Sequence, residues 1–219
     1  MAFIKSTKER NGDITSTYLF VSQVPNELDI GELFPPLRNE EIASINNVNV
    51  KREKYWAWKT LEYALNYAFG YSLDDLKVAK NDTGKWVCDK CHFSISHSNG
   101  VVMVGVSKQN IGVDIECLER FIDKFSDNQK FESFVDKIIA NGELKPTNPK
   151  DLAFTWVKKE SSFKLKNKKF FVPNEINTNS EKFSTKILSI QGKEYVISVC
   201  GKDINNCKYV VFDGNITIK

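Results

Sequence analysis

The sequence contains no long hydrophobic run. None of its 219 residues falls in an apolar window of the roughly eighteen residues that a membrane-spanning helix requires. The opening residues, MAFIKS, contain no hydrophobic segment of the secretory type. We therefore expect a cytoplasmic protein with no membrane partner. Fractions of 41% hydrophobic and 27% charged residues are typical of a globular chain, which at this length can form one large domain or two small lobes.

Cysteine is scarce, and its five copies do not indicate a disulfide framework. An odd count in a chain without an export signal is typical of reduced thiols. Residues 88–92, CDKCH, match the haem-attachment pattern, and their cysteine pair could be half of a zinc site. Haem attachment normally requires export, and no second cysteine or histidine pair of suitable spacing follows. We interpret the thiols as incidental and His92 as structural.

The charge of the chain is only mildly basic. A net charge of +3 and a pI near 8.5 do not by themselves indicate binding to duplex nucleic acid. They fit an anionic ligand or an acidic protein partner. Nucleic-acid binding is one function to consider, but the aromatic residues are not interleaved with the cations, as base stacking would require.

Hydrophobic periodicity and turn residues predict the secondary structure. Residues 14–24 are rich in β-branched and aromatic residues and predict a strand, followed by a loop-rich connection bounded by prolines. Helical spacing predicts a helix at 52–69 that ends at Gly70. The other expected elements are a turn at 81–85, a hairpin of strands 92–96 and 101–107, a strand at 111–116, helices at 127–140 and 149–166, and closing antiparallel strands at 185–190, 194–200 and 208–217.

The two long helices carry a faint internal repeat. Trp58 in the first and Trp156 in the second are each followed four residues later by glutamate, and each helix precedes short strands. Core packing of tryptophan is the simpler explanation of this match. The repeat still predicts an α+β fold of two pseudo-symmetric lobes, 1–112 and 113–219, each a helix packed on a small, mostly antiparallel sheet.

Two carboxylates interrupt the apolar strand at 111–116. Asp114 and Glu116 alternate with β-branched residues, so they share one face of the strand while the apolar residues occupy the other. The buried apolar face leaves the carboxylates facing either solvent or a cleft. Ordinary surface charge is the alternative interpretation.

The predicted helix at 149–166 supplies a third carboxylate. Glu160 and Lys164 lie one turn apart on one helix face, and Trp156 lies one turn earlier. A plain helix salt bridge would explain this pair equally well. If the helix lies beside the strand, three carboxylates and a lysine converge, which suggests a hard cation such as Mg²⁺ bound together with a phosphate.

A histidine and several cations are candidates for binding that phosphate. His97 closes a strand rich in hydroxyl groups and precedes a Ser-Asn-Gly turn, where backbone N–H groups and an imidazole can act as donors. A structural histidine is the alternative. Lys51, Arg52 and Lys54 open the first long helix, where cations oppose the helix dipole and so favour a ligand explanation.

Taken together, these segments resemble the 4′-phosphopantetheinyl transferase superfamily, and its larger surfactin-synthetase-activating type more closely than its small trimeric synthases. The family signature is a Gly-Val/Ile-Asp-Ile-Glu strand followed by a Trp-x-x-Lys-Glu-x-x-x-Lys helix, matched here by 112–116 and 156–164. Residues 93–98, FSISHS, resemble the family's Phe-Asn-Ile-Ser-His-Ser. Gly84-Lys85 corresponds to its Gly-Lys-Pro, and the segment KREK at 51–54 to its basic helix start.

The resemblance implies an enzyme with coenzyme A bound in the cleft between the two lobes. It would move the phosphopantetheine arm of coenzyme A to a serine of an acyl or peptidyl carrier protein, releasing adenosine 3′,5′-bisphosphate. Asp114, Glu116 and Glu160 would bind Mg²⁺. Glu160, or a metal-bound water beside it, would take the serine proton, and Lys164 would neutralise or protonate the leaving phosphate.

The resemblance also implies a binding site and an oligomeric state. The residues expected to bind the 3′-phosphate and adenine end of coenzyme A are Lys51, Arg52, Lys54, Lys85, Ser96 and His97. We expect a monomer, because a duplicated lobe can supply both walls of the cleft. The sequence does not distinguish fatty-acid, polyketide and peptide carriers.

The chain departs from the family pattern at two positions. Trp86 replaces the usual proline, which affects the shape of a loop more than the chemistry. Gln129 stands where many relatives carry a glutamate, so any role of that acid must pass to a water, to Glu132, or be absent. The Gln129 position, together with a shortened, tryptophan-rich first helix, motivates an alternative: a degenerate relative that binds coenzyme A or a carrier protein without transfer.

Overall fold

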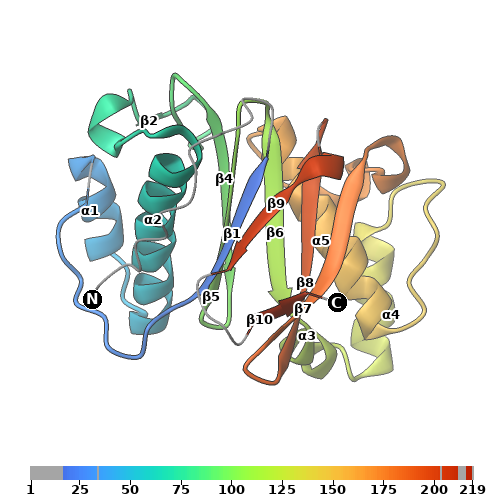
Figure 1. The fold of residues 1–219 in the computed structure, drawn as a ribbon. Helices are drawn as coiled ribbons and strands as arrows, with labels where there is room; N and C mark the ends of the chain where they lie inside the picture. Colours follow the sequence, from blue (N-terminus) through green and yellow to red (C-terminus); the bar gives the residue numbers. More distant parts are fainter. Residues whose placement is uncertain (1–16, 34, 203, 212–215, 219) are drawn as a thin grey trace.

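The structure is a computed structural model that describes residues 17–33, 35–202, 204–211 and 216–218. In this part of the chain the fold is α+β, with two four-stranded sheets, a two-stranded sheet and helices on the outer faces of the larger sheets (Figure 1). The first half contains β1 (Tyr18–Gln23), α1 (Pro36–Ala43), α2 (Val48–Phe69), β2 (Ala79–Lys80), β3 (Trp86–Val87), β4 (His92–Ser98) and β5 (Val101–Ser107). The second contains β6 (Ile111–Cys117), α3 (Leu118–Lys124), α4 (Asn128–Ile138), α5 (Pro149–Lys166), β7 (Phe183–Ile190), β8 (Lys193–Gly201), β9 (Lys208–Val211) and β10 (Ile216–Ile218).

The two large sheets repeat one arrangement. Their strand orders are β4-β5-β1-β9 and β10-β7-β8-β6, so the series β1, α2, β4, β5 corresponds to β6, α5, β7, β8. Both hairpins turn through two residues with positive φ, at Asn99-Gly100 and at Gln191-Gly192. Two such residues match the type I′ turn that joins twisted antiparallel strands.

The chain crosses between the halves near its end. β9 pairs with β1, so a strand from the second half completes the sheet of the first. This pairing is parallel, and the prediction of a closing antiparallel strand was wrong for β9. The expected boundary at 112/113 falls inside β6, which begins at Ile111.

Each large sheet is covered on both faces. The helix α2 packs against one face of the first sheet through a cluster that includes Trp58, Leu61 and Val104. The opposite face packs against the second sheet through residues such as Leu19, Met103 and Ile197. The helices α3, α4 and α5 cover the outer face of the second sheet. Figure 1 shows the resulting order of helix, sheet, sheet and helices from left to right.

Three serine side chains join the two sheets where β4 runs beside β6. Ser94, Ser96 and Ser98 lie on one face of β4, and their Oγ atoms accept hydrogen bonds from alternate backbone N–H groups of β6. The donors are the N–H groups at residues 113, 115 and 117, at 3.0, 3.4 and 3.1 Å. Hydroxyl groups therefore satisfy an edge of β6 that would otherwise leave buried donors unpaired.

A glycine allows α5 to lie directly on β6. A Cβ atom at Gly112 would stand 1.9 Å from the Ser161 carbonyl oxygen and 2.6 Å from the Leu165 nitrogen. Gly112 lies on the same face of β6 as Asp114, because strand side chains alternate. The close approach brings the helix face that carries Glu160 and Lys164 over the strand carboxylates.

The sequence predicted most element types correctly. The helix at 149–166 has the predicted bounds, because Asn148 caps it by accepting a hydrogen bond from the Asp151 N–H, and Pro149 occupies its first turn. Two short helices, α1 and α3, were not predicted. The predicted residues 14–16 and 212–215 lie outside the described part of the chain. No helix in that part is both long and apolar enough to cross a bilayer.

Replacing Gly112 with alanine should destabilise the protein by about 3 kcal/mol or more, because backbone atoms of α5 cannot move aside as a flexible side chain can. Gly31→Ala is the control, since its added Cβ would stand 3.6 Å from the Tyr55 hydroxyl, an ordinary contact. Urea unfolding measures both variants. Equal stabilities of the two would contradict the close approach of α5 to β6.

Candidate active site

Asp114 lies at the contact between β6, β4 and α5. Its Oδ1 atom accepts hydrogen bonds from Ser96 Oγ at 2.6 Å and from Lys164 Nζ at 2.7 Å. The carboxylate side chain is only 5% exposed, so Lys164 supplies the charge that makes its burial tolerable. The other oxygen, Oδ2, is buried and has no hydrogen-bond partner among the described residues.

Glu116 and Glu160 lie close enough to Asp114 for its negative charge to raise their pKa values. Burial and then the negative charge of Asp114 raise the pKa of Glu116, although Ser98, Lys164 and Trp156 oppose the shift. Burial raises the pKa of Glu160 to about 7; Lys164 opposes the shift, and Asp114 and Glu116 add to it. Trp156, Glu160 and Lys164, each one turn apart on α5, thus face the strand carboxylates as the sequence predicted.

A fully buried lysine fixes α5 on its other side. Lys159 Nζ bonds Glu143 Oε2 at 2.5 Å and the carbonyl oxygens of Pro173 and Ile176 at 3.1 and 2.5 Å. Burial lowers the pKa of Lys159, while Glu143 opposes this. Because Lys159 precedes Glu160, these contacts set the rotation of the helix that turns Glu160 toward β6.

The carboxylates fit a cation that takes only part of its coordination from the protein. The unpartnered Oδ2 of Asp114 is a free oxygen ligand, and a cation would offset both the burial and the smaller mutual repulsion that raise the pKa values of Glu116 and Glu160. Within the described ranges, no group of three or more His, Cys, Asp or Glu side chains is arranged to enclose a metal ion. Mg²⁺ commonly takes one or two carboxylates and completes its shell with phosphate and water.

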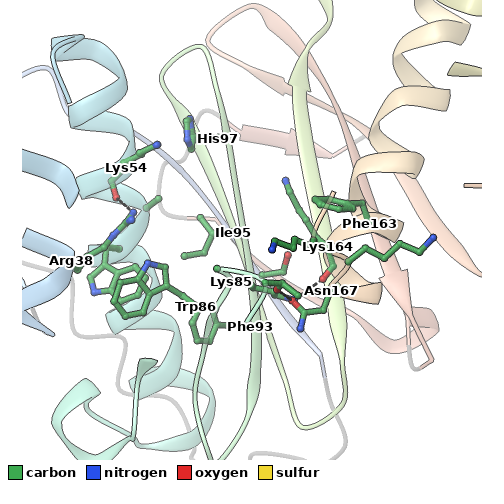
Figure 2. Close-up of a pocket in the computed structure, with 17 residues that line it drawn as sticks. Arg38, Lys54, Lys85, Trp86, Phe93, Ile95, His97, Phe163, Lys164 and Asn167 are labelled. Atoms are coloured by element: carbon green, nitrogen blue, oxygen red, sulfur yellow. Dashed lines mark hydrogen bonds between the residues drawn. The ribbon is translucent and has the colours of Figure 1, made fainter. Parts of the chain in front are cut away.

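Beside these acids lies a cleft of about 350 Å³ between the two halves (Figure 2). One wall comes from α1 and α2, the floor from β4, and the other wall from the end of α5. The charged side chains lining it are all cationic: Arg38, Lys54, Lys85, Lys164, Lys168 and Lys169. Aromatic rings of Trp58, Trp86, Phe93 and Phe163 also line it. This composition suits an anionic ligand with an apolar or aromatic part.

The turn between β2 and β3 reaches across the cleft to α5. Lys85 Nζ donates to the Lys164 carbonyl oxygen at 2.6 Å, and Thr83 Oγ1 donates to Asn167 Oδ1 at 2.7 Å. Asn167 ends α5 with a left-handed backbone conformation, φ 54°. Burial and the nearby charge of Lys164 lower the pKa of Lys85 to about 8. An anionic ligand would offset both effects.

His97 is oriented by a carboxylate from α2. Its Nδ1 atom lies 2.7 Å from Glu53 Oε2, and the other Glu53 oxygen accepts from the Gly100 N–H at 2.6 Å. Burial raises the pKa of Glu53, but the hydrogen bonds from His97 and Gly100 outweigh it and lower the value overall. Glu53 therefore holds His97 at the mouth of the cleft.

The structure brings together some of the predicted binding residues and not others. Lys54, Lys85 and His97 line the cleft. Ser96 lies behind it and binds Asp114. Lys51 and Arg52 are not among the lining residues: Lys51 Nζ donates to the Ala43 carbonyl oxygen at 3.2 Å, and Arg52 donates to backbone oxygens of residues 25 and 26.

Sequence reasoning missed several lining residues. Arg38 lies on α1, which was taken for a loop, and its guanidinium stacks 4.8 Å from the centre of the Trp58 ring. Lys168 and Lys169, which follow the end of α5, also line the cleft. They become cleft residues only because the end of α5 packs beside the first half of the chain. Gln129 and Glu132 are exposed on α4.

Comparison with known proteins does not assign the chain to a family. No protein-family model matches the chain, and no curated protein matches it.

Glu160→Gln should stabilise the metal-free protein at pH 8 by about 1–3 kcal/mol. The folded protein holds the Glu160 proton up to a pKa of about 7, against an ordinary value of 4.5. Wild-type stability should therefore fall as pH rises from 4.5 through 7, and the variant should escape this loss. Below pH 4.5 the two proteins should be equally stable.

Urea unfolding at pH 4 and pH 8 measures this difference. Glu132→Gln is the control, because Glu132 is exposed and its replacement should change stability by less than about 0.5 kcal/mol. A Glu160→Gln variant no more stable than wild type at pH 8 would contradict the burial of Glu160 beside the two strand carboxylates.

Proposed function

We propose that the protein is a Mg²⁺-dependent 4′-phosphopantetheinyl transferase. It would transfer the phosphopantetheine arm of coenzyme A to a serine of an acyl or peptidyl carrier protein. The observation that carries this proposal is the contact of Lys164 with both parts of the site: its Nζ binds Asp114 at 2.7 Å, and its side chain lines the cationic cleft. A bound pyrophosphate in the cleft would therefore lie next to the acids.

The cleft supports coenzyme A as the substrate. Coenzyme A carries a 3′-phosphate, a pyrophosphate and an adenine ring, and the cleft presents cations together with aromatic rings. Phosphate oxygens accept charge-assisted hydrogen bonds from lysine and arginine. Three strands have the same order in the two sheets, β4-β5-β1 and β7-β8-β6, which is compatible with the two-lobed fold that the family resemblance implies.

The acids support the transfer step. The serine hydroxyl oxygen would bond to the phosphorus nearer the pantetheine arm while the bond from that phosphorus to adenosine 3′,5′-bisphosphate breaks. Glu160 is suited to take the serine proton, because a pKa of about 7 matches neutral conditions. Lys164 would offset the charge that develops on the leaving phosphate.

Asp114, with Glu116 or Glu160, would hold Mg²⁺. When bound, this ion would neutralise pyrophosphate oxygens and strengthen phosphorus as an electrophile. Ser96 and Ser98 keep the strand carboxylates oriented, since they donate to Asp114 Oδ1 and to Glu116 Oε2 at 2.6 and 2.9 Å.

A second candidate is a degenerate relative that binds coenzyme A or a carrier protein without transfer. It is favoured by the exposure of Gln129 and Glu132 on α4, because an exposed glutamine and an exposed glutamate are poor replacements for the glutamate that many relatives carry there.

Incubation of the protein with coenzyme A, Mg²⁺ and a panel of apo carrier proteins, followed by intact mass measurement, tests the function. We expect one carrier to gain the mass of a phosphopantetheine group. Glu160→Gln should slow this reaction by about 10²–10⁴-fold, whereas Glu132→Gln should not. Full activity of Glu160→Gln would refute the assigned base, and tight coenzyme A binding with no mass gain on any carrier would favour the second candidate.

Lys85→Ala should weaken coenzyme A binding by roughly tenfold or more, because a charged hydrogen bond to phosphate is lost. Wild-type affinity should also fall as pH rises past about 8, where Lys85 loses its proton. Lys51→Ala, which removes a cation outside the cleft, should change affinity less than about twofold. Calorimetric titration at pH 7 and pH 9 measures these effects, and equal affinities of the two variants would contradict the assigned binding wall.

A further inference from the structure

The two cysteines of the C-x-x-C segment lie in contact. Cys88 Sγ and Cys91 Sγ are 3.3 Å apart, and Cys88 Sγ also lies 3.2 Å from the Cys91 carbonyl oxygen. A disulfide requires the sulfurs to close to about 2.0 Å, so a displacement of roughly one ångström separates the dithiol from a bonded pair. The sequence analysis noted this C-x-x-C spacing but interpreted the thiols as incidental.

The two thiols differ in accessibility and acidity. Cys88 is half-buried, whereas Cys91 is buried against the core of the first half. The hydrogen bond between the two thiols lowers the pKa of Cys88 to about 7. Burial opposes this shift, and backbone hydrogen bonds at Cys91 and Lys90 add to it. The hydrogen bond with Cys88, followed by burial, raises the pKa of Cys91. An accessible, acidic thiol beside a buried one is typical of C-x-x-C redox pairs.

Hydrogen bonds hold the segment between the cysteines in place. Asp89 Oδ1 accepts from the Lys77 N–H at 3.0 Å, and Lys90 Nζ donates to the Asp75 carbonyl oxygen at 2.7 Å. The Lys90 carbonyl oxygen accepts from Lys108 Nζ at 3.2 Å. The partners lie before the segment, at residues 75 and 77, and after it, at Lys108, so the backbone between the two cysteines is held by the surrounding fold.

Two of the three remaining cysteines provide a contrast. Cys200 Sγ donates to Glu181 Oε2 at 2.9 Å, and burial followed by this carboxylate raises its pKa. Burial raises the pKa of Cys207 to about 11, although Cys207 and Cys88 are both only half-buried. Accessibility therefore does not by itself make a thiol of this chain reactive.

We propose that Cys88 and Cys91 form a reversible dithiol–disulfide site that exchanges with small-molecule or protein disulfides. The Cys88 thiolate attacks one sulfur of the external disulfide, which forms a mixed disulfide and releases one thiolate. The Cys91 thiol then gives up its proton, attacks the Cys88 sulfur and releases the second external thiol. The protein loses two electrons and two protons, and the external disulfide becomes two thiols. This site is separate from the carboxylates of the proposed transferase.

Oxidised glutathione is a suitable probe. The folded protein is equilibrated in glutathione buffers of graded oxidation, quenched in acid, alkylated under denaturing conditions and weighed intact. We expect two alkylation sites to disappear together, with loss of two hydrogens, and to return on reduction. Peptide mapping should locate the bond at Cys88 and Cys91. Cys207→Ser, a matched partly accessible thiol, should leave this transition unchanged.

Single variants distinguish the two thiols. Cys91→Ser should accumulate a glutathione adduct on Cys88, because no second thiol resolves it, and Cys88→Ser should form an adduct at least about tenfold more slowly. Circular dichroism confirms that each variant is folded. Unchanged labelling at the most oxidising buffer, equal rates for the two variants, or stoichiometric zinc bound through these thiols would overturn the proposal. None of these outcomes depends on transferase activity.

Discussion

The ion pair between the buried carboxylate of Asp114 and the partly exposed ammonium group of Lys164 is the interaction on which the site depends. It joins β6, which closes the second sheet, to α5, whose end forms one wall of the cleft. Burying the Asp114 carboxylate has a large desolvation cost, which is offset only when the charge is well paired and hydrogen-bonded. Ser96 supplies the additional hydrogen bond to Asp114 at 2.6 Å, so the first half of the chain takes part in stabilising a contact within the second.

The rest of the site follows from how closely α5 lies on β6. Gly112 allows the backbone contact, Lys159 fixes the helix from its other side, and the serines of β4 satisfy the strand edge. The consequence is three acids crowded around one lysine in a largely buried place: burial, with a smaller contribution from the negative charges of Asp114 and Glu116, raises the pKa of Glu160 to about 7. Perturbed acids of this kind cost stability and are common at functional sites.

Local sequence signals predicted the site better than the cleft. Asp114, Glu116, Glu160 and Lys164 were recognisable because strand and helix periodicities place them on defined faces. The helix α1 was missed because Pro35-Pro36 resembles a loop signal, whereas Pro36 occupies the first turn of a helix. The helix α3 was missed because it begins directly after β6 without a turn residue.

Non-local contacts explain the other omissions. The parallel pairing of β9 with β1 joins segments at opposite ends of the chain, and no periodicity specifies it. Arg38 becomes a cleft residue only because α1 packs beside α2. Tertiary packing also decides that Lys54 faces the cleft whereas Lys51 and Arg52 bind backbone oxygens elsewhere. The basic run therefore indicated a binding region but not which of its residues line the cleft.

The return of β9 to β1 has a consequence for how the chain can be divided. Cutting between the halves would expose the edge of β1, whose N–H and C=O groups are paired with β9 in the intact protein. Exposed strand edges recruit other chains and promote aggregation. We therefore expect the two halves, although built alike, to fold as one unit, and expect fragments cut near residue 110 to aggregate unless they reassemble.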